Sequence, residues 1–215
     1  TAAVWLEIIQ GEGGVVVAND AWLEALMKQA QRYDVKIIVD EVQTGIGRTG
    51  SRFAFEQTPL VPDIITLAKG LGSGLAVGAL LATAEAAEVF TPGSHGSTFG
   101  GNPLAMTAAE ATLDLLLSDG VMADVQDKGE FLRQQLEQKL PKSIVQSIRG
   151  RGLMIGIECT IPVAPLIDAL RENGLLVVSA GPSVIRLLPS LFVTEQELMQ
   201  AVEKIQLVCQ QEVIV

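Results

Sequence analysis

VKIIVDE at residues 35–41 and DIITLAKG at residues 63–70 are two apolar runs that each end near a charged residue, Asp40 and Lys69. Short apolar runs bounded by turn residues are typical of buried strands. The segment VQTGIGRTG at residues 42–50 follows the first run and is rich in glycine, which indicates a turn. In an open α/β sheet, ligands bind at the carboxyl ends of the strands. We therefore expect Asp40 and Lys69 to lie at that edge and to form part of a ligand site.

The apolar pattern around these runs alternates between strand and helix periodicity. A strand opens the chain, a glycine turn follows at residues 11–14, and Asn19 or Asp20 can cap a helix with apolar residues at helical spacing. The run GALLA at residues 78–82 is expected to be another buried strand. This order favours the α/β class, with a mostly parallel, doubly wound sheet and helices on both faces.

The later part of the chain is predicted to be a smaller α+β domain. Pro103 begins a long helix that runs through Leu117, and residues 118–119 offer a break before an amphipathic helix. Thr194 and Glu197 fit a capping box at the start of the last helix. The predicted elements after the break are helices at 121–140 and 164–172 and strands at 144–148, 153–158, 175–178 and 185–188. We place the domain change at the break, with residues 1–118 before it and residues 119–215 after it.

Composition excludes several functional classes. The 215 residues carry a formal net charge of −10, which argues against nucleic acid or an anionic membrane as a partner. No apolar run reaches the ~20 residues of a spanning helix and no leader pattern opens the chain, so we expect a soluble cytoplasmic protein.

Cys159 and Cys209 lie in apolar patterns and are expected to be free buried thiols. His95, the only histidine, has no partners at ligand spacing, so we expect no metal site.

The two charged strand ends indicate a particular cofactor chemistry. Pyridoxal phosphate requires a lysine for a Schiff base and an aspartate at its pyridine nitrogen, and Lys69 and Asp40 supply both. The ordinary alternatives are a solvated loop lysine and a turn aspartate. Ser97 and Thr98 lie in a glycine-rich segment whose amides and hydroxyls suit a phosphate, although such a segment alone is weak support.

Several long motifs in one order make the chain resemble the class III, fold-type-I pyridoxal-phosphate aminotransferases, and most of all their acetylornithine branch. The motifs are EIIQGEGGV at 7–15, DEVQTG at 40–45 with GRTG at 47–50, AKGLG at 68–72 and GSHGSTFGGNPLA at 93–105. The resemblance implies that residues 1–118 are part of the cofactor-binding large domain and residues 119–215 the C-terminal small domain. Because the chain opens inside an apparent strand without a methionine, we expect a C-terminal fragment of such an enzyme.

The resemblance also implies roles for individual residues at the cofactor. Lys69 is the catalytic lysine, Val42 packs on the ring, and Gln43 hydrogen-bonds near the phenolic oxygen. Thr98 reaches the cofactor phosphate of a neighbouring subunit, which implies a homodimer. The full set of implied cofactor-binding residues is Asp40, Val42, Gln43, Lys69, Ser97 and Thr98.

Arg186 is a charge inside an apolar strand and therefore needs a partner. A guanidinium suits a bidentate grip on a substrate carboxylate. The resemblance implies this role, with Glu12 pairing with Arg186 to gate between donor and acceptor, and it places Glu7 at the substrate site as well. The alternative is a structural ion pair of Arg186.

The implied reaction is transamination between N2-acetylornithine and 2-oxoglutarate, which yields N-acetylglutamate 5-semialdehyde and glutamate in arginine biosynthesis. Ornithine or succinylornithine aminotransferase is the alternative within the family. An alternative of another class is a truncated, non-catalytic homologue that acts as a dimerisation or interaction module. A dinucleotide-binding role for GLGSG at residues 70–74 is disfavoured, because the G-x-G-x-x-G spacing is absent.

Overall fold

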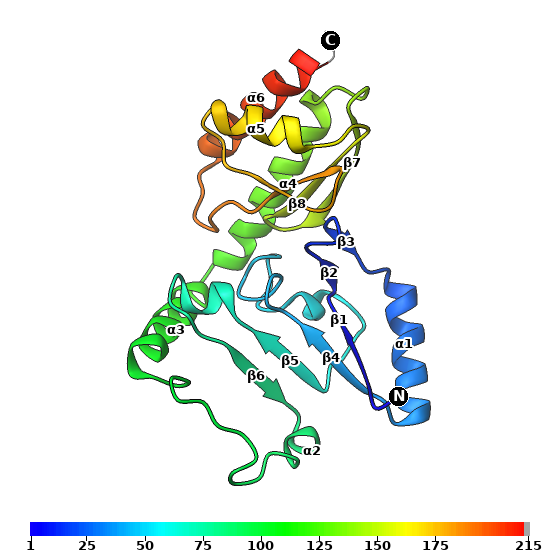
Figure 1. Ribbon diagram of the computed structural model, residues 1–215, viewed down its shortest axis with the longest axis vertical. Coiled ribbons are helices and arrows are strands. Elements are labelled where there is room, and N and C mark those ends of the chain that lie inside the picture. The colour runs from blue at the N-terminus through cyan, green and yellow to red at the C-terminus, as the bar shows by residue number, and fades with distance from the viewer. Residues whose placement is uncertain (213–215) are drawn as a thin grey trace. The chain divides into compact units, whose positions relative to one another are not determined.

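The computed structural model describes residues 1–212, which form two compact units (Figure 1). Neither unit is continuous in sequence. The first unit comprises Thr1–Ile8, Ala18–Gly47 and Ser51–Met122, and the second comprises Ile9–Val17, Arg48–Gly50 and the chain from Ala123 onward. The two short segments, 9–17 and 48–50, belong to the second unit because they bond to residues of that unit. For example, the Leu153 amide donates to Arg48 O at 3.1 Å. The assignment of residues 1–118 and 119–215 to two domains stays a prediction.

The first unit contains a four-stranded sheet in the order β1-β4-β5-β6, which Figure 1 shows side by side. The strands are β1 (Ala3–Leu6), β4 (Lys36–Asp40), β5 (Ile64–Leu67) and β6 (Ala79–Ala82). β1 pairs with β4, and β4 with β5, in parallel. The alternating burial of β4 and β5 places Ile37, Val39, Ile65 and Leu67 in the core. The prediction of an α/β fold with a mostly parallel sheet is confirmed.

β6 differs from the prediction in two respects. It pairs antiparallel with β5, and Leu80 and Leu81 are exposed, so the expectation of another buried strand was wrong. The reason for the direction is the short connection at residues 68–78, since a parallel crossover needs a dozen or more residues. Because successive side chains point to opposite faces of a sheet, the exposure of both Leu80 and Leu81 means that little of residues 1–212 covers either face there.

Two helices of the first unit begin at side-chain caps, of which the sequence analysis predicted the one at Asn19. Asn19 Oδ1 accepts the Trp22 amide at 3.2 Å before α1 (Asp20–Tyr33), and Asn102 Oδ1 accepts the Ala105 amide at 3.0 Å before α3 (Pro103–Leu116). Pro103 occupies the first turn of α3, where no backbone N–H is needed. The remaining helices of this unit are α2 (Ala84–Ala87) and the 3₁₀ helices η1 (Ala54–Gln57) and η2 (Lys69–Gly72).

The second unit contains an antiparallel sheet in the order β7-β8-β10-β9. Its strands are β7 (Val145–Arg151), β8 (Met154–Cys159), β9 (Val178–Ser179) and β10 (Val184–Leu187). A hairpin of β2 (Ile9–Gln10) and β3 (Val16–Val17) belongs to the same unit and lies next to β7. This hairpin was not predicted, because two-residue strands carry too little alternation to be recognised in sequence.

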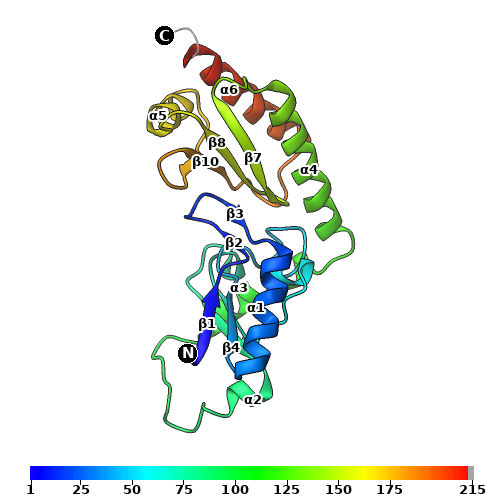
Figure 2. The ribbon, with the colours of Figure 1, turned by 90° about the vertical axis from the view of Figure 1, so that its right-hand side faces the viewer.

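Helices α4 (Val121–Lys139), α5 (Ala164–Glu172) and α6 (Glu195–Glu212) complete the second unit, and Figure 2 shows α4 and α6 beside the β7–β8 sheet. One core joins these three helices to β8 and β10, since each of the five elements contributes a fully buried side chain. Examples are Leu136, Ile157, Leu166, Ile185 and Val202. Burying a side chain of this kind contributes about 1.5–3 kcal/mol to folding. The predicted α+β arrangement of this part of the chain is therefore present.

The start of α6 carries the predicted capping box. The Thr194 amide donates to Glu197 Oε2 at 2.8 Å, and the Glu197 amide donates to Thr194 Oγ1 at 3.2 Å. The bonds that the Thr194 amide and hydroxyl donate to Glu197 Oε2 lower the pKa of the Glu197 carboxyl, because they favour its charged form. Two otherwise unpaired amides at the helix start are thereby satisfied.

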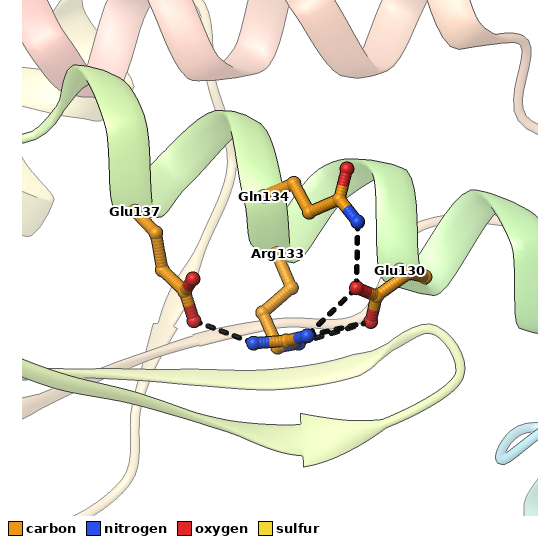
Figure 3. A network of polar contacts seen from close by, with 4 residues as sticks. All are labelled: Glu130, Arg133, Gln134 and Glu137. Atoms are coloured by element: carbon orange, nitrogen blue, oxygen red, sulfur yellow. Dashed lines mark hydrogen bonds and ion pairs between the residues drawn. The ribbon is translucent and has the colours of Figure 1, made fainter.

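A polar network covers the surface of α4 and does not belong to the site. Figure 3 shows Arg133 between Glu130 and Glu137, with Gln134 also donating to Glu130. The Arg133 guanidinium lowers the pKa of Glu130 through its hydrogen bonds. The residues of each interacting pair lie three or four positions apart, which is the ordinary geometry of surface ion pairs that support a helix. Exposed pairs of this kind contribute little to stability.

Both cysteines are buried, as predicted, and neither forms a disulfide within residues 1–212. Burial raises the pKa of the Cys159 thiol to about 11, which keeps it protonated and unreactive at neutral pH. Between residues 1 and 212, every helix is too short or too polar to cross a lipid bilayer.

Candidate functional site

Asp40 is the last residue of β4, at the carboxyl end of the parallel part of the sheet. It lies in register with Thr66 on β5. Its Oδ1 accepts the Val42 amide at 2.9 Å, and this bond turns the chain away from the sheet. Within residues 1–212, no other group bonds to the Asp40 carboxylate. One carboxylate oxygen is therefore left to receive a ligand.

Lys69 follows β5 and begins η2, so it comes from the strand adjacent to that of Asp40. Its side chain is exposed and pairs with no acid in the described part of the chain. The backbone at Lys69 is left-handed, with a φ of 41°, which is uncommon for a residue with a Cβ. Strained backbone of this kind is concentrated at functional sites, where the surrounding structure holds it in place.

Val42 and Gln43 lie in the turn directly after Asp40, and both are partly buried. The Gly45 amide donates to Glu41 O at 2.9 Å and closes this turn. A Cβ on Gly45 would lie 2.8 Å from Glu41 O, so a glycine is required there. We call residues 42–45 the cofactor turn. The structure thus brings Asp40, Val42 and Gln43 together in one short segment.

Ser97 and Thr98 lie in an exposed connection before α3. Ser97 Oγ accepts the Gly100 amide at 3.0 Å, a bond that is local to this segment. His95, in the same segment, contacts Phe90 edge to face with ring centroids 6.3 Å apart. The contacts of Ser97 and Thr98 do not join them to Asp40 or Lys69, so their role at a phosphate stays a prediction.

Arg186 lies on β10 between β8 and β9, and only 7% of it is exposed. Its Nη1 donates to Glu12 Oε1 at 2.8 Å, and the Glu12 side chain is 72% exposed. The expected pairing of these two residues is therefore present. A buried guanidinium that meets an exposed carboxylate can exchange that partner for another carboxylate with little rearrangement. Whether the pair serves a substrate stays a prediction.

The turn that carries Glu12 is held by the strand beside it. Arg149 Nε donates to Gly14 O at 2.9 Å, and Arg149 Nη1 contacts Glu158 Oε2 at 2.5 Å. Val15 next to this turn is buried with a φ of 54°, a conformation that is rare for a β-branched residue. Glu7, the other predicted substrate residue, follows β1 in the first unit and is partly buried.

Sequence reasoning assigned no role to Glu41, which the structure shows to be almost fully buried. Its carboxylate accepts the Thr44 hydroxyl and the amides of Ala54 and Phe55, the last two at 3.0 Å each. Burial raises the pKa of this carboxyl, and the three donors partly oppose that shift. One sequence signal could have revealed the role of Glu41: it is an acid directly after an apolar strand, with a threonine, Thr44, three residues later.

Arg48 was also overlooked. Its Nη1 donates to Leu153 O at 3.2 Å and to Pro189 O at 2.6 Å, so it joins the segment before β8 to the segment after β10. Burial lowers the pKa of this guanidinium, because few waters remain to solvate the charge. Its partners are distant backbone carbonyls, and no sequence pattern reveals such partners.

The residues at the sheet edge fit pyridoxal phosphate by an observation that does not depend on the motifs. The Thr66 hydroxyl, beside Asp40 in register, is buried and has no hydrogen-bond partner within residues 1–212. A buried hydroxyl without a partner is costly, and one in register with the aspartate that ends the neighbouring strand suits a polar ligand. By contrast, the described residues contain no group of three or more His, Cys, Asp or Glu side chains placed to hold a metal ion.

A mostly parallel sheet with a lysine and an aspartate at its carboxyl edge is typical of pyridoxal-phosphate enzymes. The model of the family described as aminotransferase class-III matches residues 1–209, and this chain belongs to that family. Class III aminotransferases depend on pyridoxal phosphate.

Curated relatives support the same family. The acetylornithine aminotransferase of Bacillus subtilis strain 168 is 53% identical over 204 residues, which are 95% of this chain and 53% of that protein. The acetylornithine aminotransferase of Listeria innocua is 46% identical over 215 residues, which are 100% of this chain and 56% of that protein. The chain therefore spans about half the length of the curated relatives it matches.

Solved structures give the same fold. N-acetylornithine aminotransferase from Stenotrophomonas maltophilia K279a matches with a TM-score of 0.89 and 36% identity, over 99% of this chain and 57% of that one. Ornithine aminotransferase from Plasmodium yoelii matches with a TM-score of 0.90 and 35% identity, over 97% of this chain and 56% of that one. Fold similarity thus does not separate the two named activities.

Proposed function

We propose that this chain carries the cofactor lysine of an enzyme that transfers the amino group of N2-acetylornithine to 2-oxoglutarate. The single observation that supports this most is the pair of Asp40 and Lys69 at the ends of adjacent strands, where one carboxylate oxygen and the amine have no partner among residues 1–212. The 53% identity to an acetylornithine aminotransferase supports the substrate. A cytoplasmic place for the reaction, within arginine biosynthesis, is part of the same proposal.

When bound, pyridoxal phosphate would supply an electron sink for negative charge at the substrate carbon. Lys69 would hold the cofactor through its amine and, once displaced by the substrate, would use that amine to move the proton at the substrate carbon. Asp40 would keep a proton on the pyridine nitrogen through the oxygen that Val42 leaves open. Val42 and Gln43 would contact the ring and its phenolic oxygen. Glu12 would release Arg186 whenever a substrate carboxylate replaces it.

The proposal is tested by adding pyridoxal phosphate to this chain and following the visible absorbance of a lysine adduct. Borohydride reduction followed by peptide mapping then locates the adduct. A single adduct on Lys69 supports the proposal. Absence of an adduct, or adducts scattered over surface lysines, contradicts it for this chain and favours the non-catalytic alternative.

The donor is tested separately, because ornithine aminotransferases are among the structural neighbours. In an active preparation, glutamate formation from 2-oxoglutarate is measured with N2-acetylornithine, N2-succinylornithine and free ornithine in turn. We expect the acetylated donor to give the highest kcat/KM. A higher value with either of the others would reassign the substrate within the family.

Replacing Arg186 by lysine is expected to weaken binding of carboxylate substrates. The ammonium keeps the charge but loses the bidentate geometry, and a hydrogen bond to a charged group contributes about 1.5–3 kcal/mol. We expect the KM for 2-oxoglutarate to rise about 10- to 100-fold, as measured from initial rates of glutamate formation. The matched control is Arg171→Lys, since Arg171 forms an exposed pair with Asp168 on α5. An unchanged KM in R186K would favour the structural ion pair.

We also propose a homodimer in which Thr98 reaches the cofactor of the partner subunit. Its support is the apolar surface of the first unit, where Phe99 is 82% and Leu104 is 69% exposed. Light scattering is expected to give twice the 22.8 kDa mass of the chain. Leu104→Glu is expected to shift the mass to the monomer, whereas Leu207→Glu, at an exposed position of α6 in the second unit, is not. A monomeric parent chain would contradict this proposal.

A further inference from the structure

A buried carboxylate lies directly after the aspartate of the proposed cofactor site. Only 1% of Glu41 is exposed, and within residues 1–212 no lysine or arginine pairs with it. Taking an ionised carboxylate out of water without a cation is costly unless other donors compensate. The three donors at Glu41 therefore compensate for the burial of its carboxyl group, and their positions indicate what the residue does.

The three donors lie near the two ends of the loop that runs from residue 42 to residue 55. Oε2 accepts the Thr44 hydroxyl and the Ala54 amide, and Oε1 accepts the Phe55 amide. Thr44 lies in the cofactor turn, whereas Ala54 and Phe55 form the start of η1. A single carboxylate thus joins the turn after Asp40 to the helix that ends the loop. We call this set of bonds the Glu41 clamp.

The Glu41 clamp restrains Val42 and Gln43 because these two residues lie between Glu41 and Thr44, whose hydroxyl the Glu41 carboxylate accepts. Residue 41 holds the turn through its side chain at Thr44 and through its carbonyl at Gly45. Directly after the turn, Ile46 is buried with a φ of 56°, a strained conformation that its surroundings must hold. Release of the carboxylate would therefore free the turn to relax.

We propose that Glu41 is a positioning residue that holds the cofactor turn in the conformation that receives pyridoxal phosphate. The consequence for cofactor affinity rests on the proposed function, whereas the clamp itself does not. A carboxylate is required, because glutamine would place its NH₂ group against either the Ala54 or the Phe55 amide. One hydrogen bond would be lost, and two donors would face each other.

The test compares four variants of this chain. Glu41→Gln breaks the clamp, Thr44→Val removes one donor at nearly constant volume, and Thr44→Ser retains that donor. Glu24→Gln is the matched control, since Glu24 is an exposed acid on α1. Two quantities are measured: hydrogen exchange of the backbone amides in residues 42–55, and the Kd of pyridoxal phosphate by absorbance titration.

Glu41→Gln is expected to speed exchange in residues 42–55 and to raise the Kd, each by about tenfold, as for the loss of one buried hydrogen bond. Exchange in β8, in the other unit, should not change. Thr44→Val should show a smaller effect of the same kind, while Thr44→Ser and Glu24→Gln should match the parent chain. If Glu41→Gln does not fold, the comparison of valine with serine at residue 44 decides the question.

Each alternative result has a definite meaning. Unchanged exchange in Thr44→Val and Glu41→Gln would overturn the clamp, and faster exchange with an unchanged Kd would overturn the positioning role. If the parent chain binds no pyridoxal phosphate, the proposed function fails for this chain. In that event the exchange measurement still decides whether Glu41 holds the turn, so the two failures are distinguishable.

Discussion

Lys69→Ala is expected to abolish the borohydride-trapped adduct and to lower turnover by at least about 10²–10⁴-fold, the usual contribution of a general base. The loss is larger still if the covalent attachment itself is needed. Because alanine also has a Cβ, the left-handed backbone at residue 69 is strained to a similar degree in both proteins. We therefore expect the free energy of unfolding to change by no more than about 0.5 kcal/mol, as for other exposed substitutions.

Two further variants make the Lys69 experiment specific. Lys69→Arg keeps the positive charge, but a guanidinium stays protonated and cannot condense with an aldehyde at neutral pH, so it should fail in the same way. Lys28→Ala removes an exposed lysine on α1 of the same unit and should leave the adduct unchanged. A single trapped adduct on another lysine in Lys69→Ala would show that the assignment is wrong.

Gly150→Ala is expected to destabilise the second unit by about 3–5 kcal/mol, which combines backbone strain with overpacking. Gly150 lies on β7 with a φ of 135°, a conformation that is essentially restricted to glycine. A Cβ built there would lie 1.9 Å from Met154 O on the paired strand β8. Either the strand pair opens or the backbone shifts, and both cost stability. Chemical denaturation with a probe in the second unit measures the change.

Gly181→Ala is the matched control for the Gly150 substitution. Gly181 also has a positive φ, of 73°, but a Cβ there would meet no atom within 4 Å. Its cost should therefore be limited to the backbone term, about 1–2 kcal/mol. Equal losses in the two variants would mean that the contact with Met154 O does not matter.

Much of the local structure was predictable because it depends on neighbouring residues. Asn19, Asn102 and Thr194 cap helices through bonds that reach three residues along the chain, and such spacing is visible in sequence. Strands β4 and β5 were predictable from continuous apolar runs, since parallel strands that are buried on both faces have such runs in their sequence. The exposed, antiparallel β6 was not, because its apolar residues look the same whether or not another layer covers them.

The candidate site likewise has features that the sequence predicted and features that only the structure revealed. The sequence placed Asp40 and Lys69 at strand ends, and the parallel pairing of β4 and β5 puts those ends at one edge of the sheet. It did not reveal the Glu41 clamp, whose amide partners lie 13 and 14 residues away. It suggested the Glu12–Arg186 pair only through family resemblance, because 174 residues separate the two.

The sequence by itself determined which reactive groups the chain carries, where its helices begin and the family to which it belongs. These properties follow from residue types and short spacings, which do not depend on the fold. Only the tertiary structure decided the direction of β6, the hairpin that carries Glu12, the burial of Glu41 and the carbonyl partners of Arg48. Each of these depends on contacts between segments far apart in the chain, where packing and the need to satisfy buried polar groups determine the outcome.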